Sequence, residues 1–207
     1  TSNINAKLHY SNGRAIITAA SARALGGEIR ISGRLEQSKA GNPLNLAIAG
    51  SATGLDISSV PVIKHKNAQG FLSGNFVLSG TTNKPKLDII TQLRHGKLNK
   101  IKLGTTAARL VITKTGLEVK RAEIAAASGI IRATGTIKQK QLNITMQAQS
   151  LDLLQSLSPF GIKDHSGTVD FSGSITGTLS NPVASGAIEI YEWQNGRYHF
   201  DYANADI

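Results

Sequence analysis

The chain repeats itself, and this repeat restricts its fold more than any other feature. The turn-like stretch GTTNKPKLD at residues 80–88 recurs as GTLSNPVAS at residues 177–185, an offset of 97. Upstream, Gly27 in GGEIRISGRLEQ aligns with Gly129 in SGIIRATGTIKQ, an offset of 102. Further landmarks recur in the same order, so we interpret the chain as two copies of one unit.

The copies occupy residues 1–103 and 104–207, and the final ANADI at 203–207 resembles the start of a third. No flexible linker separates the copies, which predicts that they stack as one continuous sheet. The chain begins with TSNINAKL, without an initiating Met, and is interpreted as a segment of a longer protein.

Alternation of apolar and polar residues is the main secondary-structure signal in both copies. In QLNITMQAQ, Leu142, Ile144 and Met146 point one way and the polar residues between them point the other. Turn signals such as Asn12-Gly13 separate the runs. The pattern predicts about seven antiparallel strands per copy, with a β-bulge between Val119 and Ala122 where the phase changes.

One segment in each copy lacks this alternation. LDLLQSLSP at 151–159 places leucines at helical spacing, with Asp152 in the first turn and Pro159 at the end. The corresponding segment LDISSVPVI at 55–63 carries a weaker version. One short helix per repeat is therefore expected.

The sequence offers little catalytic chemistry. It has no cysteine, and no nucleophile elbow, phosphate-binding loop or zinc-protease motif. Its five histidines are not spaced as metal ligands. We expect a protein that is not an enzyme, without catalytic residues, metal or cofactor.

A formal net charge of +10 suggests an anionic partner. The basic residues are dispersed, however, as expected of solvated strand edges that suppress aggregation. Trp193, Tyr191 and Tyr198 lie near Arg197, but this aromatic stretch is surrounded by acidic residues. Nucleic acid is therefore not expected as a partner.

A long sheet with one apolar face has to cover that face. It can close as a filled barrel or sandwich, or curl and leave the face open to an apolar ligand. Aromatic residues make up only 5% of the chain, which is few for a filled interior. The prediction is an all-β fold: an elongated, curled antiparallel sheet with an open hydrophobic groove.

The alternation assigns the lining of this groove. The predicted lining residues are Ile29, Ile31, Leu46, Ile48, Leu78, Ile89, Ile131, Ile137, Leu142, Ile144, Met146, Val169, Phe171, Ile175 and Ile188. Glycines within strands mark bends or close approaches, and those predicted to provide curvature are Gly74, Gly80, Gly173 and Gly177.

Three segments of the second copy carry a family resemblance: Gly129 to Ile137, the L-D-L-x-x-L stretch at 151–157, and GTVDFSGSITGTLSNPVASGA at 167–187. With their weaker counterparts in the first copy, they resemble the AsmA-like superfamily, in particular its TamB (translocation and assembly module) branch in diderm bacteria. The resemblance implies a β-taco, a sheet folded lengthwise into an apolar trough. It also implies a periplasmic location, with the parent protein anchored in the inner membrane and spanning the cell envelope.

The resemblance implies two functions. The first is phospholipid transport between the inner and outer membranes, with acyl chains lying in the trough. The second is a scaffold or chaperone that assembles outer-membrane proteins and autotransporters by β-strand augmentation, with TamA or another outer-membrane assembly protein bound through regions outside this segment. A third hypothesis is that the segment is a purely structural spacer. The unbroken apolar pattern favours the lipid conduit. A scaffold needs an accessible sheet edge, and the lysines and prolines at the strand starts protect the edges instead.

Overall fold

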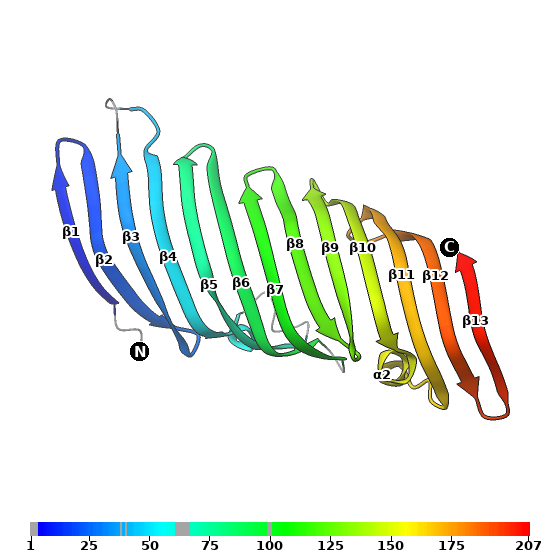
Figure 1. Ribbon diagram of the computed structural model, residues 1–207. Coiled ribbons are helices and arrows are strands. Elements are labelled where there is room, and N and C mark those ends of the chain that lie inside the picture. Colours follow the sequence, from blue (N-terminus) through cyan, green and yellow to red (C-terminus); the bar gives the residue numbers. More distant parts are fainter. Residues whose placement is uncertain (1–3, 38, 40, 61–66, 99–100) are drawn as a thin grey trace.

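A computed structural model gives the fold for residues 4–37, 39, 41–60, 67–98 and 101–207. Thirteen antiparallel strands form one sheet and follow one another in chain order, so that the molecule is a long meander (Figure 1). The strands are β1 (Ile4–Ser11), β2 (Arg14–Ala24), β3 (Gly27–Glu36), β4 (Asn45–Asp56), β5 (Ala68–Thr81), β6 (Pro85–Leu98), β7 (Ile101–Thr113), β8 (Gly116–Ala126), β9 (Gly129–Lys138), β10 (Gln141–Asp152), β11 (His165–Thr178), β12 (Pro182–Asn195) and β13 (Tyr198–Asp206). The prediction of an all-β antiparallel fold is confirmed.

Tight turns set the register between neighbouring strands. Asn12 and Gly13 have φ values of 48° and 73°, and Gln139 and Lys140 have values of 49° and 67°. Two successive positive φ angles twist the chain in the sense that antiparallel strands need. Each turn therefore starts a hairpin in which apolar residues of both strands point to the same side.

The structural repeat comprises six strands, not the predicted seven. Gly80 and Gly177 have φ values of 89° and 84°, and His95 and Glu192, also 97 residues apart, have values of 53° and 49°. β7 then corresponds to β1, and β13 begins a third set. The prediction of about seven strands per copy is therefore one strand too many. The proposed boundary at residues 103–104 lies within β7, which pairs with both β6 and β8.

Both copies have a helical turn at the predicted place, but it is shorter than predicted. The first is a 3₁₀ helix, η1 (Ile57–Ser59); the second is α2 (Leu153–Leu157), followed by the 3₁₀ helix η2 (Ser158–Phe160). The Asp152 side chain accepts a hydrogen bond of 2.7 Å from the backbone N of Gln155, as an N-cap does. The predicted first residues are strand instead, because Leu55 and Leu151 are taken up in strand pairing. Residues 61–63 lie outside the described residues.

The sheet is a single open layer. β1 and β13 lie at opposite ends of it, and α2 sits at one end of β10 (Figure 1). Among the described residues, only Val111, Ala126, Ala148 and Leu153 are buried apolar side chains, with exposures of 6%, 9%, 4% and 8%. No described helix is long and apolar enough to cross a membrane.

The predicted curvature glycines occur in two structural settings, and each setting contains one glycine from each copy. Gly74 and Gly173 lie where the backbone of the next strand passes so closely that a Cβ atom would collide with it. At Gly173 the carbonyl oxygen of Ser185 and the ring of Phe171 fill that space. Gly80 and Gly177 instead have positive φ angles just before a turn. All four positions thus require glycine for the backbone path.

Replacing Gly173 with valine should destabilise the sheet, because the new side chain displaces Phe171 and the β12 backbone. Overpacking of this kind costs about 1–3 kcal/mol of unfolding free energy, which urea denaturation measures. The neighbouring exposed Ser172 points to the other side of the sheet, so Ser172→Val is the matched control. Equal stability of the two variants would show that Gly173 has no steric role.

Candidate functional site: the apolar face of the sheet

Strand pairing divides the side chains between two faces. Residues that lie opposite each other in an antiparallel pair point to the same side. Ile144 on β10 pairs with Gly135 on β9 and with Ile175 on β11, and its neighbour Thr145 pairs with Thr134 and Ser174. We call the side that carries Ile144 the apolar face and the side that carries Thr145 the polar face.

All fifteen residues predicted to line the groove lie on the apolar face. The pairing leads from Leu46 through Leu78 and its neighbours to Ile137 and Leu142 without a change of side. The fifteen are all half-buried. The structure thus gathers the predicted residues on one surface, while their role in lipid binding remains a prediction.

Three central strands, β6 to β8, contribute apolar-face residues that the prediction omitted. Their side chains complete the surface between the two copies: Leu87, Leu110, Ile112, Leu117 and Val119. The predicted bulge is present, with a register shift between Val119 and Ala122. This shift hides the alternation in β8, but extending the pattern separately from each side of the bulge would have found these residues.

Side-chain size varies across the apolar face in rows that run perpendicular to the strands. One row consists mainly of small residues on consecutive strands: Ala22, Ile29, Ala52, Gly74, Thr91, Ala108, Ala122, Ala133, Met146 and Gly173. Larger residues flank it, such as Ile89 and Ile144 on one side and Leu93 and Ile131 on the other. The apolar face therefore has a lower band of small side chains that runs along the length of the sheet between bands of larger ones.

At neighbouring positions in β5 and β6, side chains on the polar face are more exposed than those on the apolar face. Ile90 on the polar face is 57% exposed, and Val77 on that face is 49% exposed. Their neighbours Ile89 and Leu78, on the apolar face, are half-buried. In the described part of the chain no second layer covers the apolar face, so its residues are shielded mainly by one another.

A broad hollow lies on the polar face, not on the predicted lining. It has a volume of about 1220 Å³ and extends over β1 to β5, with Ser21, Ser32, Ala49, Ser51 and Asn75 among its lining residues. It exists because these side chains are small, so that the backbone of the strands is its floor. Since the described strands form a single open sheet, they enclose no apolar channel.

Ion pairs between charged residues lie on the polar face. Arg14 Nη2 lies 2.6 Å from Glu36 Oε1, and Arg109 Nη2 lies 3.0 Å from Asp88 Oδ2. The hydrogen bond from each arginine lowers the pKa of its partner carboxyl group, Glu36 or Asp88. At Glu36 the positive charge of Arg14 is the second cause. Arginine thus neutralises acids on this face, and these exposed pairs add little stability.

The aromatic stretch near the C-terminus is bonded internally. The Tyr191 hydroxyl donates a hydrogen bond of 2.7 Å to Glu189 Oε2. Trp193 stacks on Phe200 with 4.8 Å between ring centroids and donates a hydrogen bond to His165 Nδ1. These rings are therefore engaged with each other, with a histidine and with a carboxylate.

In the described part of the chain, no cluster of His, Asp or Glu is arranged to hold a metal ion. No model of a known protein family, no curated protein and no solved structure matches the sequence or fold. Fold and site define a single-layer antiparallel β meander with one continuous apolar face.

The hydrogen bond to Glu189, together with partial desolvation and the carboxylate charge, raises the pKa of Tyr191 to about 12. The stabilising effect of this hydrogen bond should be present below the ordinary tyrosine pKa of about 10 and be lost as the pH rises through about 12. Ultraviolet titration should therefore show a late tyrosine component that disappears in Tyr191→Phe and shifts to lower pH in Glu189→Gln. The control Tyr198→Phe should retain it, and a late component that survives in Tyr191→Phe would contradict the assignment.

Proposed function

We propose that the apolar face binds the acyl chains of phospholipids, and that the protein is a lipid-transfer segment of the cell envelope. The observation that carries the proposal is the continuity of this face. It crosses the sheet from β1 to β12, with large aliphatic side chains on successive strands and no covering layer in the described structure.

An exposed apolar surface of this extent calls for a partner, because soluble proteins rarely expose large contiguous apolar patches. Acyl chains fit this surface chemically: each buried CH₂ group contributes roughly 0.8 kcal/mol, and no directional bond is needed. The row of small residues between rows of larger ones offers a lower path along the sheet. A lipid can move along such a surface because successive positions are nearly equivalent.

In this proposal the sheet curls around its apolar face when lipid is bound, as in the β-taco of the AsmA-like proteins that the sequence resembles. The glycines at 74, 80, 173 and 177 support such bending, since they already mark close approaches and positive φ angles. The same resemblance supports a periplasmic location, an inner-membrane anchor in the parent protein, and transfer between the inner and outer membranes.

One observation favours the scaffold function as a second candidate. β1 presents apolar side chains at an end of the described sheet, and Ile4, Leu8 and Tyr10 are 71%, 63% and 69% exposed. Such an edge can accept another strand by β-augmentation, either from an outer-membrane protein, with TamA as partner, or from another part of the parent chain. Lys7 on this strand opposes indiscriminate pairing.

The decisive variant for lipid binding is Ile144→Asp. In the open sheet the carboxylate can reach water, so the protein should stay folded, whereas a charge that must be desolvated against an acyl chain should reduce binding by about tenfold or more. Photo-crosslinking to lipid from position 175, the cross-strand partner of Ile144, measures binding, and thermal melting measures folding.

Thr145→Asp is the matched control, because it places the same charge one residue away on the polar face. It should leave crosslinking unchanged. Loss of the fold in Ile144→Asp alone would indicate a closed core, and undiminished crosslinking in a folded variant would remove Ile144 from the lipid path.

A further inference from the structure

One long border of the sheet is formed by successive hairpin turns, several of which are joined by backbone hydrogen bonds. Gln37 N donates to Gly13 O at 2.9 Å, Thr82 N donates to Leu44 O at 2.9 Å, and Leu179 N donates to Lys140 O at 3.0 Å. These bonds tie the first three turns of this border together, and the turn before β10 to the turn before β12. Strand pairing keeps the intervening turns beside them, and we call this border the rim.

Four consecutive turns of this rim each carry a lysine: Lys39 between β3 and β4, Lys84 between β5 and β6, Lys114 between β7 and β8, and Lys140 between β9 and β10. We call these the turn lysines. All four are exposed. Strands lie about 4.8 Å apart, so neighbouring turn lysines are separated by about 10 Å, close to one Debye length. Their electrostatic fields therefore overlap along the rim.

No carboxylate within the described ranges neutralises the turn lysines. The acids closest to this rim in sequence are engaged elsewhere, since Glu36 is paired with Arg14 and Glu118 with Lys120. The outer turns of the same rim carry asparagine instead of lysine, at Asn12 and Asn181. Positive charge is thus concentrated over the middle of the sheet.

The charge of the whole chain follows the same division. Residues 1–160 contain 21 of the 23 basic residues and seven of the 13 acidic ones, a net charge of +14. Residues 161–207 contain the remaining two basic and six acidic residues, a net charge of −4. An anionic headgroup is therefore attracted to the rim over β3 to β10 and not over β11 to β13.

We propose that the turn lysines bind headgroup phosphates and make the apolar face selective for anionic phospholipids. This inference rests on the proposed lipid function. The hydrocarbon of one leaflet is about 15 Å deep, half of a bilayer core, and about five residues of a strand span that length. A lipid with its headgroup at Lys140 thus places its chains along β10 beside Leu142, Ile144 and Met146.

Lysine suits this role because its ammonium group binds phosphate as a flexible point charge. A basic residue near an anionic lipid surface strengthens binding about fivefold. Neutral and zwitterionic lipids can still bind through their chains. An experiment can therefore measure headgroup selectivity and total lipid binding separately.

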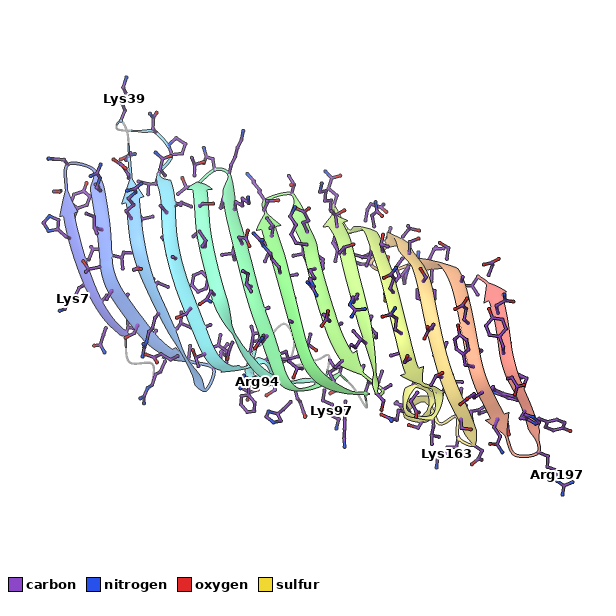
Figure 2. All side chains as sticks on the ribbon, viewed as in Figure 1. Lys7, Lys39, Arg94, Lys97, Lys163 and Arg197 are labelled. Carbon is purple, nitrogen blue, oxygen red and sulfur yellow. The ribbon has the colours of Figure 1, made fainter. Side chains whose placement is uncertain are left out.

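The opposite border also carries basic residues, and these provide the control. Arg94, Lys97, Lys163 and Arg197 lie along that border, while Lys39 projects from the rim (Figure 2). Changing these four to glutamine removes the same charge as changing the four turn lysines. Any difference between the two variants therefore reports position and not net charge.

The test offers vesicles with equal amounts of phosphatidylglycerol and phosphatidylethanolamine to the protein and measures bound lipid by mass spectrometry. The wild type should enrich phosphatidylglycerol. The Lys→Gln variant of the four turn lysines should lose that enrichment about fivefold or more at unchanged total lipid. The control variant and a Lys→Arg variant at the turn lysines should keep it, and circular dichroism checks that all are folded.

Equal loss in both glutamine variants would show attraction by net charge and overturn the inference. Binding without enrichment in the wild type would overturn it as well, while leaving the lipid function intact. Absence of bound lipid in every folded variant would refute the proposed function itself.

Discussion

The ladder of backbone hydrogen bonds within one layer is the interaction on which this structure depends. Among the residues that the structure describes, no second layer buries the apolar face, and very few side chains are buried. Each inner strand is held by its two neighbours, through backbone pairing and contacts between opposite side chains. Packing on the apolar face, such as Ile144 beside Ile175, therefore adds to pairing but does not replace it.

The two faces perform different physical tasks. On the polar face, pairs such as Arg132 with Glu123 join neighbouring strands and satisfy charges locally. On the apolar face, no second layer covers the aliphatic side chains in the described part of the chain. Because a residue's face is fixed by strand parity, the chain can change one surface with little effect on the other. The four turn lysines lie outside both faces, where they need no partner in the sheet.

Much of this architecture was readable from local pattern. Alternation alone placed Ile144 and Phe171 on the same side, because a strand has a period of two. The path of the apolar face through β6 to β8 was harder to see, since the bulge after Val119 interrupts the period. The helices were overestimated because strand pairing extends to Asp56 and Asp152 before the chain turns. Local pattern does not decide whether a sheet curls, because curling depends on twist and side-chain volume summed over many strands.

The even number of strands in the repeat has a consequence for how long such a protein can become. After six strands the chain returns to the same border and the same face, so β7 starts where β1 started. An added copy lengthens the sheet by about 29 Å, six strand spacings, without inverting either surface. Duplication of the unit can therefore extend the sheet in equal steps, whereas a copy with an odd number of strands would start the next one from the opposite border.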